Sequence, residues 1–225
     1  MHTTHGRALP FAQGLKLANP KLTVVACGGD GDGMAIGLGH TYHAIRRNVN
    51  LTYILMDNHV YGLTKGQTSP RSDWGFKTKT TPEGNIETPV ATLEMALSAG
   101  ASFVAQGFST ELQQLVDLIV AAVKHPGFSL VNVFSPCVTF NKVNTYDWFK
   151  ERLVDSSSIK DYDRHNKGKV LQHILEHEGL LTGLLYEDEA KKSYEEVSGL
   201  SNKNRMQAVR KFTKVEFNQL VEDFR

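Results

Sequence analysis

Cysteine is scarce in this 225-residue sequence, which has two, at positions 27 and 137. Two cysteines exclude a disulfide-rich scaffold, and their spacing excludes the Cys-x-x-Cys pair of a zinc ribbon. The longest apolar runs, such as residues 22–27 (LTVVAC), have the length of a strand and fall far below the ~20 residues of a membrane helix. Residues 1–14 lack the apolar core of a signal peptide. We therefore expect a cytoplasmic protein with no membrane partner.

An excess of charge of one sign is also missing. The 25 Lys and Arg residues nearly balance the 24 Asp and Glu residues, which gives a net charge of +1. Without a basic stripe, a nucleic-acid partner is not expected. Hydrophobic residues make up 40% and charged residues 22%, which is ordinary globular composition and argues against disorder over most of the chain.

The first 60 residues alternate between helical and strand patterns. We predict a helix over residues 9–19, a strand buried on both faces over 22–27, a second helix over 34–46 and a second strand over 51–57. The glycine cluster 28-GGDGDG-33 lies between the first strand and the second helix. This order is a βαβ unit, so the sheet should be parallel with a right-handed crossover.

Residues 58–88 break this alternation. They carry four glycines, two prolines and many Ser and Thr, and a loop of ~30 residues inside a compact domain is usually functional. After it we predict a helix to Ala99 capped by Thr88, a strand over 102–106, a helix over 111–125 capped by Ser109 or Thr110, and a strand over 128–135. The fold class is therefore α/β, a three-layer parallel sheet.

The sequence changes character after Cys137. We divide the chain into an α/β domain over residues 1–140 and a C-terminal, mainly helical extension over 141–225. Helices are predicted over 145–153, 166–178 and 204–224, and residues 191–196 (KKSYEE) are interpreted as a solvated surface or linker.

The glycine cluster predicts a phosphate site, because a glycine turn that leads into a helix presents bare N–H groups to an anion. A dinucleotide site with Asp57 on the ribose is one interpretation, but the spacing G-x-G-x-x-G is absent. Asp30 and Asp32 would also repel a pyrophosphate unless a cation lies between them. Mg²⁺ prefers oxygen ligands, so Asp30, the amide oxygen of Asn58 and a backbone carbonyl near Val60 form a candidate Mg²⁺–diphosphate site.

Gly29-Asp30-Gly31 followed after 25 residues by Asp57-Asn58 resembles the thiamine diphosphate motif, which usually ends in Asn-Asn. Four flanking stretches add specificity: HGRALPFAQGLKLANP (5–20), GGDGDGMAIGLGH (28–40), ILMDNHVYGLTKGQTSP (54–70) and TKTTPEGNIETP (78–89). Together they resemble the beta subunit of two-subunit 2-oxoacid:ferredoxin oxidoreductases over about residues 3–185.

The resemblance implies roles for individual residues. Asp30, Asn58 and the backbone oxygen of Val60 match Mg²⁺ ligands, and Lys65 matches a lysine on the substrate side of the thiazolium. Residues that match contacts with thiamine diphosphate or lie near it are His5, Gly29, Gly31, Asp32, Gly62 and Leu63. Cys137 matches the last of four cysteine ligands of a [4Fe–4S] cluster. Simpler interpretations stay open: a turn residue at Asn58, a solvated His5 or Lys65, and an inert thiol at Cys137.

The resemblance also shows a departure. Beta chains of this kind begin roughly 60 residues earlier, with a first strand and three further cluster cysteines. A [4Fe–4S] cluster takes about four thiolates, and we interpret Cys27 as a core residue of its strand. We therefore expect an N-terminally truncated beta chain that could bind a cluster only in a full-length form.

The implied activity is the oxidative decarboxylation of a 2-oxoacid to acyl-CoA and CO₂, with electrons passed to ferredoxin. The implied partners are an alpha subunit, ferredoxin, coenzyme A and the 2-oxoacid. We expect 2-oxoglutarate rather than pyruvate, because residues 78–89 resemble 2-oxoglutarate-type members and because a second carboxylate needs a cation, for which Lys65, Arg71, Lys77 and Lys79 are candidates. Alternatives are an inactive fragment, a cofactor-binding module without turnover, or a dinucleotide-dependent oxidoreductase.

Overall fold

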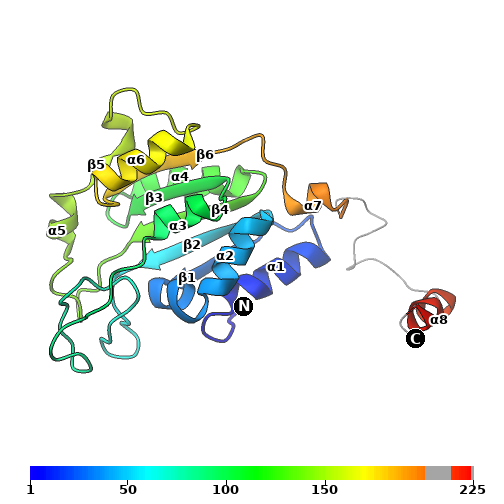
Figure 1. Ribbon diagram of the computed structural model, residues 1–225, viewed down its shortest axis with the longest axis horizontal. Coiled ribbons are helices and arrows are strands. Elements are labelled where there is room, and N and C mark those ends of the chain that lie inside the picture. Colours follow the sequence, from blue (N-terminus) through cyan, green and yellow to red (C-terminus); the bar gives the residue numbers. More distant parts are fainter. Residues whose placement is uncertain (201–213, 224–225) are drawn as a thin grey trace.

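In a computed structural model that describes residues 1–200 and 214–223, the chain forms a six-stranded sheet with helices on both faces (Figure 1). The strand order is β1-β2-β4-β3-β6-β5. The strands are β1 (Val25–Gly29), β2 (Leu51–Asp57), β3 (Phe103–Phe108), β4 (Phe128–Phe134), β5 (Val154–Asp155) and β6 (Leu181–Glu187).

Strands β1 to β4 run parallel, as the sequence predicts. The strand predicted over residues 51–57 coincides with β2, which lies between β1 and β4 and is buried along most of its length. The carboxyl ends of β1 and β2 therefore lie side by side at one end of the sheet.

The helices form two layers, which confirms the three-layer arrangement. One apolar cluster joins the sheet to α1 (Ala8–Ala18), α2 (Leu38–Arg47), α3 (Thr92–Ser98) and α6 (Lys167–Glu176). A second cluster joins β3 and β4 to α4 (Leu112–Lys124) on the opposite face. Two predicted helix caps are wrong: α3 begins at Thr92 after Ala91 rather than behind Thr88, and the cap of α4 is Glu111 rather than Ser109 or Thr110.

The prediction for the first strand is wrong in position and in burial. β1 begins three residues later than predicted, and Val25 is 45% exposed while Ala26 is buried. Cys27 is also exposed, so it is not a core residue. The physical reason is that α1 packs on one face of β1, whereas α4 covers the other face mainly over β3 and β4. β1 is an edge strand and thus half-covered.

The segment after residue 140 contributes more than helices. It contains α5 (Tyr146–Lys150), β5, the 3₁₀ turn Ser156–Ser158, α6, β6, α7 (Tyr194–Val197) and α8 (Lys214–Glu222). β6 pairs antiparallel with β3, which the sequence analysis did not predict. The linker interpretation of residues 191–196 is wrong, because Glu195 is 3% exposed and its carboxylate accepts the Asn50 N–H. Residues 204–213 and 224 of the helix predicted over 204–224 lie outside the described part, and the domain division at 140 stays a prediction.

The described helices include none with the length and apolarity needed to span a membrane.

Candidate functional site

The candidate site lies where β1 and β2 end. Gly29 pairs with Met56, so Asp30 follows beside Asp57, and Asn58 is the next residue. Asp30 is 2% exposed and Asp57 is fully buried. The structure thus brings the predicted carboxylate and amide to the same edge of the sheet.

The glycine loop is packed too closely for side chains. A Cβ at Gly31 would lie 2.2 Å from the Tyr61 ring, and one at Gly33 would lie 2.3 Å from the Tyr53 hydroxyl oxygen. The Tyr61 hydroxyl donates to the Gly31 carbonyl at 2.8 Å. The helix predicted over 34–46 is divided into a π-helical turn, Asp32–Ile36, and α2, with non-helical backbone at Ala35. The glycines are therefore required by contacts with β2 and the following loop.

Asp32 draws the N-terminal segment onto this loop. One carboxylate oxygen of Asp32 lies 3.0 Å from Nδ1 of His5 and accepts the Gly6 N–H at 2.5 Å. The His5 side chain stays half-exposed, with its ring 5.9 Å from that of Tyr61. The structure thus brings His5, Gly31 and Asp32 together.

Asp30 is a buried carboxylate with a neutral partner. The Ser69 hydroxyl, from the long loop, donates to its Oδ2. Burial, and next the nearby charge of Asp57, raise the pKa of Asp30 to about 6, although the Ser69 hydrogen bond acts in the opposite direction. An uncompensated carboxylate in such a place favours a cation.

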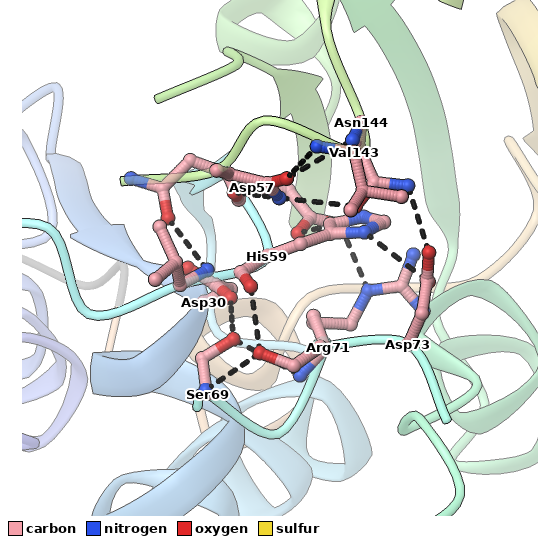
Figure 2. A network of polar contacts seen from close by, with 12 residues as sticks. Asp30, Asp57, His59, Ser69, Arg71, Asp73, Val143 and Asn144 are labelled. Atoms are coloured by element: carbon pink, nitrogen blue, oxygen red, sulfur yellow. Dashed lines mark hydrogen bonds and ion pairs between the residues drawn. The ribbon is translucent and has the colours of Figure 1, made fainter. Parts of the chain in front are cut away.

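Asp57 has its own cation, and Figure 2 shows the network around it. Nε of Arg71 donates to Oδ2 of Asp57 at 2.9 Å, and Nε2 of His59 lies 3.4 Å from Oδ1. Burial alone would raise the pKa of Asp57, but the charges of Arg71 and His59, together with the hydrogen bonds from Arg71 and Asn132, outweigh it and hold this pKa low. The network continues from His59 to Asp73, which accepts a hydrogen bond from Asn144 at 2.9 Å.

This network corrects two expectations. Arg71 was a candidate for binding a substrate carboxylate, but it is paired with Asp57, and its side chain is 16% exposed. Asp57 was considered as a ribose ligand in the dinucleotide interpretation, but its full burial prevents that contact. The carboxylate of Asp57 therefore pairs within the protein and is not available to a ribose.

Asn58 begins a tight turn next to Cys137. Its amide oxygen accepts the Val60 N–H at 3.1 Å, and its carbonyl accepts from Asn141 at 3.3 Å. A Cβ at Gly62 would lie 3.4 Å from Sγ of Cys137 and 4.0 Å from Nδ2 of Asn58. The structure therefore places Asn58, Gly62 and Cys137 together.

Leu63 and Lys65, which the sequence also predicts for the site, lie away from its buried residues. Leu63 is fully exposed. Lys65 has a positive φ of 80° and lines a cavity of about 430 Å³ together with Lys77, Lys79 and Phe140. Lys65 thus faces a cationic cavity on the outer side of the loop.

The donor set suits a hard cation. Within the described residues, no group of three or more His, Cys, Asp and Glu side chains is arranged for a metal. A cation here would instead use the Asp30 carboxylate with amide and carbonyl oxygens, which is the chemistry that Mg²⁺ accepts together with phosphate oxygens. The buried Asp30 carboxylate fits such a group.

Sequence reasoning missed four residues of the site: Ser69, His59, Asp73 and Asn144. Apart from the contact of His59 with Asp57, the contacts that join these four residues to the site span between 14 and 71 positions in the chain, so no local pattern reveals them. The one available signal was the density of polar residues in the loop after β2, which marked the region without marking its members.

Two family profiles match the chain. The profile described as "Thiamine pyrophosphate enzyme, C-terminal TPP binding domain" covers residues 1–133. A second profile, which describes the C-terminal part of the pyruvate ferredoxin oxidoreductase beta chain, covers residues 137–214. Together they span both the glycine loop and the segment after Cys137.

Individual relatives agree with the profiles. The 2-oxoacid:ferredoxin oxidoreductase subunit beta of a Sulfolobus species is 47% identical over 163 residues, which are 72% of this chain and 53% of the relative, so the chain spans about half of that protein. The 2-oxoglutarate synthase subunit KorB of Archaeoglobus fulgidus is 41% identical over 181 residues, covering 78% of this chain and 68% of the relative.

A solved structure extends the likeness to three dimensions. It is a 2-oxoglutarate:ferredoxin oxidoreductase from Magnetococcus marinus with 2-oxoglutarate, coenzyme A and succinyl-CoA bound. The TM-score is 0.84 at 40% identity, covering 96% of this chain and 73% of that one. The chain therefore belongs to the thiamine pyrophosphate enzymes and, among them, to the beta subunits of the 2-oxoacid:ferredoxin oxidoreductases.

Proposed function

We propose that the chain supplies the diphosphate and metal half of a thiamine diphosphate site in a 2-oxoacid:ferredoxin oxidoreductase. The observation that carries this proposal is the buried carboxylate of Asp30 beside Asn58 and the glycine loop. The complete enzyme would decarboxylate a 2-oxoacid oxidatively, form an acyl-CoA and reduce ferredoxin.

Each predicted residue has a part in this proposal. Asp30, the amide oxygen of Asn58 and the carbonyl of Val60 would hold Mg²⁺. The diphosphate and thiazolium would contact Gly29, Gly31, Asp32, Gly62, Leu63 and His5. Thiamine diphosphate supplies the electron sink that the decarboxylation needs. The chain's own residues bind and orient the diphosphate and keep water from the buried end of the site.

The alpha subunit is the first partner that the proposal requires. The names of the relatives as beta subunits support it. We place the aminopyrimidine half of the cofactor site on that partner, so the isolated chain should bind cofactor without turning over substrate. Ferredoxin, coenzyme A and a 2-oxoacid complete the set, in the cytoplasm.

Calorimetry tests the cofactor assignment. Thiamine diphosphate should bind to the chain, mixed with its alpha subunit, in the presence of Mg²⁺ and not after chelation. Binding of NAD without metal would overturn the assignment in favour of a dinucleotide enzyme. Binding of neither would leave an inactive fragment as the better description, and Mg²⁺-dependent binding without turnover in the complex would indicate a cofactor-binding module.

Cys137 is proposed as a [4Fe–4S] ligand only in a form that has further cysteines. The chain has two cysteines, and a cluster takes about four. Its place beside Gly62 supports a position close to the cofactor. Reconstitution of this chain with iron and sulfide should give no stoichiometric cluster absorption, and a stoichiometric cluster would contradict the ligand count.

For the substrate we propose 2-oxoglutarate over pyruvate. The names of the Archaeoglobus relative and of the Magnetococcus structure support this choice. Lys65, Lys77 and Lys79 remain candidate partners of the second carboxylate, because they line one cavity, whereas Arg71 is paired with Asp57. The test compares kcat/KM of the alpha–beta complex for both acids, and an equal or higher value for pyruvate would contradict the preference.

A further inference from the structure

We propose that Ser69, held in place by Arg71, is a positioning residue that orients the Asp30 carboxylate toward its cation. This inference rests on the proposed function, because it gives a role to a side chain that touches the metal site only through Asp30. Neither the sequence motifs nor the resemblance assigns a role to Ser69.

The hydrogen bonds of Ser69 have a fixed direction. Its oxygen accepts the Arg71 backbone N–H at 3.2 Å, and its hydroxyl donates to Oδ2 of Asp30, because an ionised carboxylate only accepts. Ser69 is 5% exposed, and its own N–H donates to the Ser72 hydroxyl at 2.9 Å. The hydrogen bond to Asp30 therefore lies among buried groups that restrict rotation of the Ser69 and Asp30 side chains.

Arg71 connects the loop that carries Ser69 to the end of β2. Its Nε donates to Asp57 at 2.9 Å, and its Nη1 donates to the Val90 carbonyl at 2.6 Å. The Val90 N–H in turn donates to the Pro70 carbonyl at 2.8 Å. The loop is thus closed at residues 70 and 90, and its side chains reach the ends of two neighbouring strands.

The spacing of these contacts gives the loop a positioning function. Position 69 meets Asp30 at the end of β1, and position 71 meets Asp57 at the end of β2, as Figure 2 shows. One carboxylate oxygen of Asp30 thereby accepts the Ser69 hydroxyl, and this bond restricts rotation of the carboxylate. Hydrogen bonds to ligating groups commonly change metal affinity by about 10- to 100-fold.

The experiment measures the affinity for Mn²⁺, used in place of Mg²⁺, in the alpha–beta complex saturated with thiamine diphosphate. Electron paramagnetic resonance of the free ion gives the fraction that is bound. Ser69→Ala should weaken Mn²⁺ binding by about tenfold or more, whereas Ser69→Thr, which keeps the hydroxyl, should stay within about threefold of wild type. Ser129→Ala is the matched control, since it removes a buried hydroxyl that donates to the Ala122 carbonyl away from the site.

A double-variant cycle separates positioning from general stability. If Ser69 acts through Asp30, Ser69→Ala should have little further effect on Mn²⁺ affinity in an Asp30→Asn background. Equal effects in both backgrounds, or Mn²⁺ affinity of Ser69→Ala within about threefold of wild type, would overturn the inference. If the alanine variant does not fold, Ser69→Cys, whose thiol is a weak donor, replaces it.

The same measurement distinguishes the inference from the function on which it rests. Absence of Mn²⁺ binding in the wild-type complex would overturn both. Wild-type binding that Asp30→Asn weakens and Ser69→Ala does not would overturn only the role of Ser69 and leave the metal site in place.

Discussion

Two buried polar networks lie at opposite ends of the same sheet and are built from different groups. Where β3 and β4 begin, Ser102 donates to Oδ1 of Asn48 at 2.7 Å and lies 2.8 Å from Nε2 of His125. Where β1 and β2 end, Asp30 and Asp57 lie beside Arg71. The hydrogen bonds of the first network join neutral groups, with the Glu187 carboxylate 3.9 Å from Nδ1 of His125, whereas the second network is built on charged side chains.

The neutral network is centred on Asn48. The Asn48 side chain also accepts the Phe128 N–H and donates to the Lys192 carbonyl, both at 3.0 Å. Burial lowers the pKa of His125, which favours the uncharged ring. These hydrogen bonds join β4 to the segment before β2 and to residue 192, so they stabilise the fold at this end of the sheet.

In the charged network the two buried carboxylates have different partners. Asp57 is matched by Arg71, whereas Asp30 has a hydroxyl as its partner. A buried carboxylate without a counter-charge is destabilising, and proteins keep such groups where a ligand compensates them. The comparison thus shows that burial of polar groups alone does not distinguish the candidate site from the other end of the sheet. The distinguishing feature is a buried carboxylate, Asp30, whose hydrogen-bond partner is a neutral hydroxyl.

The largest expected effect comes from breaking the ion pair between Arg71 and Asp57 in the charged network. Arg71→Met leaves the buried Asp57 charge without its guanidinium partner, so the free energy of unfolding should fall by about 3–5 kcal/mol. Urea denaturation followed by circular dichroism measures it. Adding Asp57→Asn should recover part of the loss, and a loss below about 1 kcal/mol in the single variant would show that the pair is not coupled.

Breaking the neutral network should cost less and leave the site unchanged. Ser102→Ala removes the donor to Asn48 and the contact with His125, for a loss of about 1–3 kcal/mol in unfolding free energy. Mn²⁺-dependent cofactor binding should stay within about twofold of wild type, because no charge is altered. A marked fall in metal affinity would mean that the two ends of the sheet are coupled.

A smaller effect is expected from the glycine loop. Gly31→Ala places a methyl group against the Tyr61 ring and should lower stability by about 1–2 kcal/mol as the ring is displaced. Gly39→Ala, in the first turn of α2 with open space around it, should raise stability by up to about 1 kcal/mol. Thermal unfolding of the pair checks the sign of each change, and a neutral Gly31→Ala would contradict the close packing.

Much of the fold is predictable from local patterns, and the failures have physical reasons. β2 is buried on both faces, so its apolar run LTYILMD marks its ends correctly. β1 was placed over 22–27 because that run is apolar, yet Leu22 is 41% exposed and the pairing with β2 includes Gly28 and Gly29. β6 was missed because Gly183 interrupts its pattern, and the pairing with β3 has a register shift between Val104 and Ala105.

The meeting of Asp30 and Asn58 was predictable from the sequence, whereas the side chains that surround them were not. Asp30 and Asn58 follow two predicted neighbouring strands, so their meeting is a consequence of topology. Ser69 and Arg71 meet their partners only after the loop over residues 58–88 has folded, 39 and 14 positions away. Such contacts depend on tertiary structure, and composition alone assigned Arg71 to the substrate.

The most direct test of the charge imbalance is the Asp30→Asn variant, with stability and Mn²⁺ affinity measured on the same protein. Without metal, the variant should unfold at a higher temperature than wild type, because it removes a buried carboxylate beside Asp57. With thiamine diphosphate and the alpha subunit, its Mn²⁺ affinity should fall at least about tenfold, or ~1.4 kcal/mol. A variant that is less stable without metal, or that binds Mn²⁺ as tightly as wild type, would contradict the account.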